Sequence, residues 1–571
     1  MRKAIAALVF IAPTLGAQAP LPLKYKAKPT SAAISAADLM SRLYVYADDS
    51  MMGRETGTKG HLMSTAYIAA EVQRFGLKPG GDNGTFFQTV PAFTRTLNVE
   101  KSSITVDGMT LKAGVDFINQ GSRPLVRKID GATVIYGGMF GDTAGMPSAE
   151  MLAGKIVVLS VRENAGGGFG RGGGGGGGFG GGQAFQQMLN GAAAIVRIGG
   201  AELPANLVHP NPTAGMTLGA TPSLPAPTEG PVTLVVTEHA AETLLGMPVS
   251  MAKSGTMGKT IHGTLVFDEK QMPARNVVAI LRGSDPKLRE TYVAMGAHND
   301  HVGMLTSNNP PDHDSLHLYN AARYAITGMI PRGQRPTPEQ AAEVQAIRIN
   351  MDSVHKLRPA RLDSVRNGAD DDGSGTVTLL EIAEQFAKSP TKPKRSIVFV
   401  WHVGEEKGLW GSRWYTDHTT VPKDSIIAQL NMDMVGRGEK TDLPVGSPTY
   451  LQLVGSKRLS TELGALVEDQ NAKEKMPFTI DYQFDANGHP ENIYCRSDHF
   501  HYARIGIPVV FFTTGLHGDY HQVTDEPQYI NYDHMARIGQ FVYDIAVRLG
   551  YSDKRPVVDG VKMDPMGVCR Q

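Results

Sequence analysis

Four strongly apolar runs in the second half of the chain limit its fold more than any other feature. They are YVAMGAH, SIVFVWH, IIAQLNMDM and IPVVFFTT, and each is long enough to form one buried strand. Helical patterns lie among them at 377–387 and 532–549, where apolar residues recur on one helix face. Apolar strands that alternate with helices are typical of a sheet buried on both faces. The sequence therefore predicts an α/β fold with a mostly parallel, mixed sheet covered by helices.

A different kind of sequence precedes these runs. From 126 to 266, short β-rich runs such as ATVIYGG and KIVVLSV alternate with glycine- and proline-rich turns, and helical patterns are few. Because 571 residues exceed what one hydrophobic core usually supports, this stretch is predicted to form a separate β-rich insert. Its segment 166–182 is mostly glycine, and no apolar helix follows as a dinucleotide-binding motif requires, so we interpret it as a low-complexity loop.

Residues 1–19 have the pattern of an export signal. Two basic residues precede an apolar run at 4–12, and small residues follow. Cleavage after Ala17 or after Ala19 would fit this pattern. We therefore expect 1–19 to be a signal peptide and the mature protein to be exported, either to the periplasm or to the medium.

The overall composition excludes several classes of partner. The chain has 56 acidic and 56 basic residues, so it carries no net positive charge that would favour the binding of nucleic acid. No apolar run after the signal approaches the roughly 20 residues of a transmembrane helix, so no membrane span is expected in the mature chain. Cys495 and Cys569 are too few for a cysteine-built zinc site, and the sequence leaves open whether they pair.

Residues that can bind a metal ion follow each of the four apolar runs. His298 ends the first run, Glu405 and Glu406 follow the second, Asp433 lies at the end of the third, and His521 lies downstream of the fourth. In parallel sheets, ligands bind beyond the carboxyl ends of the strands. We therefore expect these side chains to converge at one edge of the sheet.

The motif GADDDGSGT, 368–376, adds three adjacent carboxylates. Adjacent negative charges repel, so such a turn is either exposed to water or neutralised by a cation. Two histidines with several carboxylates suit zinc, and a carboxylate can bridge two ions about 3.5 to 4 Å apart. If Asp371, Glu406 and Asp433 are ligands, two Zn²⁺ ions keep one positive charge for a bridging hydroxide.

The motifs together resemble those of a known family. The series H-x-D, G-A-D-D-D-G-S-G, G-E-E-K-G-L-W-G-S, N-M-D-M and Y-H-x-x-x-D is similar to the co-catalytic dizinc exopeptidases, which include secreted bacterial aminopeptidases, glutamate carboxypeptidase II and the transferrin-receptor ectodomain. The resemblance implies a zinc-exopeptidase fold of the phosphorylase/hydrolase-like type. It divides the chain into an N-terminal part of the peptidase domain at 20–125, a protease-associated insert at 126–266, a metal-binding part at 267–550 and a tail at 551–571.

The resemblance also implies a role for each matched residue. Asp371 would bridge two zinc ions, His298 and Asp433 would complete one of them, and Glu406 and His521 would complete the other.

Two further residues receive roles in the same way. Glu405 would act as general base and acid, and Asp300 would orient His298. The family pattern also implies a cis peptide bond between Asp371 and Asp372. Arg496 and the SDH motif at 497–499 resemble the family's substrate-side loop without being ligands; the substrate-binding residues and the oligomeric state stay open.

The function implied is an exported dizinc exopeptidase that acts on peptides, most simply an aminopeptidase that uses a metal-bridged hydroxide. Three alternatives stay open: a carboxypeptidase of the same fold, a glutaminyl cyclase of the same fold, and a binding ectodomain without catalytic activity. The intact ligand set argues against the last of these. Metal content and a panel of substrates separate the others.

A long insertion separates the first apolar run from the aspartate motif. At 304–367 the chain carries about 60 residues more than a compact βα loop needs. Thr337-Pro338 has the pattern of a helix start, and an apolar stripe over 344–354 predicts one added helix, packed on the surface rather than closing over the site. His313 and His317 are interpreted as part of an exposed loop rather than a further metal site.

Overall fold

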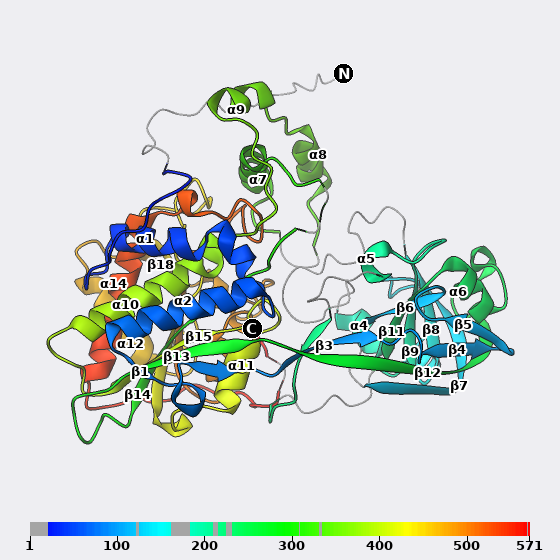
Figure 1. Cartoon of the computed structure of the whole chain (residues 1–571), viewed down its shortest axis with the longest axis horizontal. Helices are drawn as coiled ribbons and strands as arrows, with labels where there is room; N and C mark the ends of the chain where they lie inside the picture. The colour runs from blue at the N-terminus through cyan, green and yellow to red at the C-terminus, as the bar shows by residue number, and fades with distance from the viewer. Residues whose placement is uncertain are drawn as a thin grey trace.

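The computed structural model describes residues 21–121, 125–161, 183–208, 215–223, 231–305, 307, 309–330, 334–567 and 569–571. The expected signal peptide at 1–19 and the glycine-rich segment at 166–182 lie outside these residues. The described strands form two sheets, which occupy the left and right halves of Figure 1.

The first sheet holds the four apolar runs. Its described strands follow the order β1-β13-β15-β14-β16-β19-β17-β18, with β2 paired to β13. Their bounds are β1 (Lys78–Pro79), β2 (Phe87–Thr89), β13 (Arg275–Leu281), β14 (Tyr292–His298), β15 (Ser396–His402), β16 (Ile426–Met432), β17 (Tyr450–Val454), β18 (Thr479–Asp481) and β19 (Val509–Thr513). The runs form the parallel centre, β15-β14-β16-β19, and all their strand residues are buried. Antiparallel neighbours on both sides make the sheet mixed.

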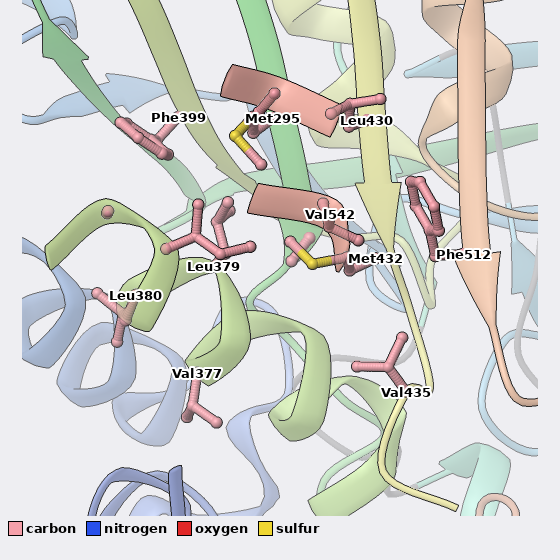
Figure 2. Close-up of a cluster of buried hydrophobic side chains, with 14 of the residues drawn as sticks. Met295, Val377, Leu379, Leu380, Phe399, Leu430, Met432, Val435, Phe512 and Val542 are labelled. Carbon is pink, nitrogen blue, oxygen red and sulfur yellow. The ribbon is translucent and has the colours of Figure 1, made fainter. Parts of the chain in front are cut away.

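Helices cover both faces of this sheet, because successive side chains of a strand point to opposite faces. In β15, Phe399 and Trp401 join one apolar cluster, whereas Val398 and Val400 join another on the opposite face. The first cluster, part of which Figure 2 shows, also draws on α1 (Ala36–Tyr46), α2 (Lys59–Phe75), α10 (Gly375–Lys388), α12 (Thr461–Lys473) and α14 (Tyr532–Tyr551). The second draws on α11 (Trp410–Asp417) and α13 (His499–Arg504). The predicted α/β fold is confirmed.

The second sheet is built from strands earlier in the chain. Its described strands follow the order β10-β3-β12-β7-β8-β9-β11-β6, with β4 paired to β12 and to β5. Their bounds are β3 (Ala92–Leu97), β4 (Ser103–Val106), β5 (Met109–Lys112), β6 (Phe117–Gly121), β7 (Val126–Met139), β8 (Ile156–Ser160), β9 (Ala194–Ile198), β10 (Met216–Leu218), β11 (Val232–Val236) and β12 (Met257–Met272). Four helices accompany them, α3 (Ala149–Leu152), α4 (Gln183–Leu189), α5 (Ala205–Val208) and α6 (Glu238–Leu245). The sheet extends beyond 126–266 at both ends, and its identity as a protease-associated domain stays a prediction.

The insertion at 304–367 forms three helices in its described part, grouped at the top of Figure 1. They are α7 (His313–Thr327), α8 (Pro338–Ala346) and α9 (Met351–Leu357). As predicted, a helix starts after Thr337: α8 begins with a capping box made by Thr337 and Gln340. The expected single stripe over 344–354 is wrong, because Asn350 caps a new helix by accepting a hydrogen bond from the backbone N–H of Ser353.

The expectation that His313 and His317 lie in an exposed loop is also wrong. Both belong to α7, whose first turn is capped by the Asp312 side chain, a hydrogen-bond acceptor for the backbone N–H of Ser315. His313 is completely buried, because α7 packs against the segment around His521.

The two cysteines, whose pairing the sequence left open, lie close together in the structure. Cys495 and Cys569 form a disulfide, which ties the C-terminal segment to the body of the first sheet.

In the described part of the chain, none of the helices has the length and apolar character that crossing a bilayer requires.

Candidate metal centre

All five predicted ligands lie together beyond the carboxyl ends of the parallel strands, with Asp371 among the other four. Its Oδ1 lies 3.2 Å from His298 Nε2, and its Oδ2 lies 3.0 Å from His521 Nε2. Asp433 Oδ1 is 3.7 Å from the same His298 nitrogen, and Glu406 Oε1 is 3.0 Å from the same His521 nitrogen. Asp371 thus lies between two groups, each with one other carboxylate and one imidazole.

The atoms that face one another are buried and unpaired. His298 Nε2, His521 Nε2, Asp371 Oδ2 and Glu406 Oε1 all lack a hydrogen-bond partner. Buried polar atoms are almost always paired, so a cluster of unpaired ones points to a missing cation. Imidazole nitrogens and carboxylate oxygens are the ligands that zinc prefers in the absence of cysteine. The residues present therefore fit zinc.

The aspartate motif is fixed by contacts of its backbone. The Asp525 carboxylate accepts hydrogen bonds from the backbone N–H groups of Asp370 and Asp371, at 3.0 and 3.1 Å. Gly368 has φ 52°, and a Cβ there would lie 2.2 Å from the carbonyl oxygen of Asp371, so the turn requires glycine. The peptide bond between Asp371 and Asp372 is cis, as the resemblance implies.

Two further residues contact this centre, His301 and Asp372, and neither was predicted from the sequence to do so. His301 is completely buried, with Nδ1 3.0 Å from Glu406 Oε1 and 3.6 Å from Asp371 Oδ2. Its position three residues after His298, in the same strand-end loop, was the available signal. Asp372 has a backbone role, because its Oδ2 accepts from the N–H of His298 at 2.9 Å and its Oδ1 from that of Gly375 at 2.9 Å.

Glu405 and Asp300 lie beside the ligand group. The backbone N–H of Glu405 donates to Asp300 Oδ1 at 3.2 Å, and Thr56 donates to Asp300 Oδ2 at 2.8 Å. His298 Nδ1 is 3.1 Å from the backbone carbonyl of Asp300 and 3.7 Å from its carboxylate. The Asp300 segment therefore contacts the ring nitrogen that faces away from Asp371.

The electrostatics differ sharply between neighbouring carboxylates. Burial raises the pKa of Glu405 well above its usual range; His298 opposes this shift, and the charges of Glu406 and Asp433 add to it. For Asp371, burial acts in the same direction, but His301 and the other imidazoles outweigh it and hold the pKa well below its usual range. Glu406 behaves like Asp371, since His521 outweighs burial and lowers the pKa to about 2. Glu405 therefore holds a proton far more readily than the candidate ligands Asp371 and Glu406.

A cavity opens directly beside these residues. Asp371, Glu405 and Asp433 contribute to one part of its wall. The apolar part consists of Phe484, Ile493, Phe511 and Leu516. Arg496 and Tyr520 also line it, and Arg496 Nη1 donates to Glu491 Oε2 at 2.8 Å. An apolar side chain could therefore lie next to the acidic centre.

Comparison with known proteins agrees with this arrangement. Residues 337–546 match the sequence profile described as Peptidase family M28. Leucine aminopeptidase 1 of Fusarium vanettenii is 28% identical over 227 residues, which cover 38% of this chain and 54% of that protein. The enzyme of the same name from Trichophyton rubrum is 26% identical over 243 residues, covering 40% of this chain and 59% of that protein. The chain thus spans about half the length of the curated relatives it matches.

Two solved structures are similar at low sequence identity. An aminopeptidase from Aneurinibacillus sp. strain AM-1 has a TM-score of 0.46 at 15% identity, covering 92% of this chain and 97% of that one. A zinc aminopeptidase from Bacillus subtilis has a TM-score of 0.45 at 15% identity, covering 91% and 96%. The residues that match the family profile include Asp371, Glu406, Asp433 and His521. The part of the chain at 337–546 is thus similar to peptidase family M28.

Proposed function

We propose that this protein is an exported metallo-aminopeptidase that binds two zinc ions and releases N-terminal residues from peptides. The observation that carries the proposal is the position of Asp371 between His298 and His521, with unpaired buried atoms on both sides. His298 and Asp433 would hold one ion, and Glu406 and His521 would hold the other. Bound zinc would supply a Lewis acid for the substrate carbonyl and lower the pKa of an attacking water.

The protein's own residues account for the remaining steps. Glu405 lies in the cavity wall beside Asp371, and its raised pKa suits a group that takes a proton from water and returns it to the leaving amine. Phe484, Phe511 and Leu516 would surround the side chain of the residue being released. The expected substrates are therefore peptides with an apolar N-terminal residue.

The direct test is a panel of reporter peptides. We expect hydrolysis of leucyl-4-nitroanilide and of Leu-Gly-Gly, and no hydrolysis of their N-acetylated forms, because an aminopeptidase recognises the free amine. Activity should disappear with 1,10-phenanthroline and return with zinc. Hydrolysis of the acetylated peptides from their C-terminal end would contradict the proposal.

One observation favours a second candidate, a carboxypeptidase. The Arg496 guanidinium lines the same cavity and could pair with a substrate carboxylate, although Glu491 already accepts one of its hydrogen bonds. Peptides with free and amidated C-termini separate the two functions. A requirement for the free carboxylate, lost in Arg496→Met, would replace the aminopeptidase proposal by this one.

The cavity also predicts how specificity can be changed. Replacing Leu516 with Ala enlarges the apolar wall, so kcat/KM for phenylalanyl substrates should rise relative to leucyl substrates by about 10-fold. Leu516→Met, which keeps the volume, should leave the ratio within about twofold. The measurement is kcat/KM for both 4-nitroanilides. An unchanged ratio in Leu516→Ala would place the released side chain elsewhere.

A further inference from the structure

A second group of buried side chains joins the insertion to the segment that follows His521. His313 begins α7, Asp363 lies near the end of the insertion, and Glu526 lies beyond His521. Their exposed fractions are 0%, 8% and 4%. One nitrogen or oxygen from each of the three lies within 4.8 Å of the others.

One ring nitrogen of His313, Nε2, has no hydrogen-bond partner. Nδ1 lies 3.4 Å from Asp314 Oδ1, which accounts for a proton on that nitrogen. Nε2 then carries a lone pair, has no hydrogen-bond partner, and faces Glu526 Oε1 at 3.6 Å. Two acceptors that face each other in a buried site repel unless a proton or a metal cation lies between them. The first metal centre shows the same arrangement at His521 and Glu406.

The charges near this group also favour a cation. Asp363, Glu526 and Asp314 contribute three negative charges, and Arg361 and Arg358 contribute two positive charges, with Arg358 Nη1 3.9 Å from Asp314 Oδ1. Arg361 Nη1 lies 3.2 and 3.3 Å from the two oxygens of Glu526, so it neutralises only part of the total. One negative charge therefore remains beside the unpaired His313 nitrogen, which favours a cation there.

We propose that His313, Asp363 and Glu526 bind a divalent metal ion that is separate from the first centre. One imidazole with two carboxylates suits zinc or another first-row transition metal better than calcium or magnesium. The ion would tie the insertion to the segment that carries His521. Two other contacts of α7 reach the residues just before His521, from His317 to Asp519 at 2.9 Å and from the Tyr324 hydroxyl to the Leu516 carbonyl at 2.6 Å.

The first test counts zinc. The full-length protein is stripped with chelator, equilibrated with zinc chloride and analysed by mass spectrometry of the metal. His313→Gln and Asp363→Asn should each hold one zinc ion per chain fewer than the unmodified protein. His317→Gln lies on the same helix outside the cluster and serves as the control, with unchanged zinc. Equal zinc in all four proteins would overturn the proposal.

The second test can be decided with the unmodified protein alone. Zinc should slow amide hydrogen exchange in α7 at least 10-fold in the unmodified protein, because the ion fixes its first turn to Glu526. The same protection should be absent in Asp363→Asn. Exchange in α7 that is the same with and without zinc would overturn the proposal, even if both variants failed to fold.

Discussion

Replacing Glu405 with Gln is expected to lower kcat by about 10²- to 10⁴-fold while the zinc content stays unchanged. Glu405 lies in the cavity wall with Asp371 and Asp433, and its raised pKa contrasts with the lowered pKa of Asp371. Glutamine keeps nearly the same shape and cannot accept or return a proton. The measurements are kcat with leucyl-4-nitroanilide and metal content by mass spectrometry.

A surface glutamate provides the control for this substitution. Glu343 is exposed on α8, so Glu343→Gln removes the same charge without touching the cavity and should keep full activity. If Glu405→Gln stays active, the proton transfer belongs to another group. If it instead loses zinc, Glu405 is a ligand.

Replacing Arg42 with Met is expected to lower the free energy of unfolding by about 3 to 5 kcal/mol. Arg42 on α1 is 1% exposed and pairs with Glu71 on α2 and with Glu381 and Glu384 on α10. Without the guanidinium, the buried Glu381 loses the cation that it pairs with, and Glu71 and Glu384 keep only the half-exposed Arg74. Urea unfolding followed by tryptophan fluorescence measures the loss.

A neighbouring arginine supplies the matched control. Arg74 pairs with the same Glu71 and Glu384, but 45% of its side chain is exposed. Arg74→Met should therefore cost less than about 1 kcal/mol. If Arg42→Met and Arg74→Met lowered the free energy of unfolding by similar amounts, burial would not explain the contribution of Arg42.

The decrease in the free energy of unfolding caused by Arg42→Met should be larger at pH 8 than at pH 5. Burial raises the pKa of Glu381 to about 7, although Arg42 opposes the shift. A carboxyl group whose pKa is raised by folding favours the folded state at low pH, and that contribution disappears as the pH rises through the folded pKa. Removing Arg42 raises this pKa further, so the protonated group is tolerated at pH 5 and the charge is costly at pH 8. Equal losses at the two pH values would contradict this explanation.

The candidate centre could be anticipated because its residues stand at recognisable places in the chain. His298 and Asp433 each mark the end of an apolar run, and Asp371 lies in an unusual row of acids. His301 was missed because its neighbours in the sequence explain it equally well as a satisfied loop histidine. Only its 3.0 Å contact with Glu406, from a different strand end, gives it a place in the centre.

The insertion illustrates the opposite case. Thr337 identifies the start of α8 from local hydrogen bonding alone, which is why that boundary was predicted. Nothing local indicates that His313 is buried, since its burial depends on Glu526 and the segment after His521. Sequence patterns report which face of a helix is apolar and leave its partner unspecified.

The sequence by itself determined the α/β class, the placement of metal-binding residues after the apolar runs and the chemical type of each candidate ligand. These depend on periodicity, capping and residue identity, which are local properties. Only the tertiary structure decided that Asp371 lies between His298 and His521, that Asp525 holds the aspartate motif and that the insertion meets Glu526. Such contacts join segments far apart in the chain, and their distances follow from the packing of the whole core rather than from any one stretch of sequence.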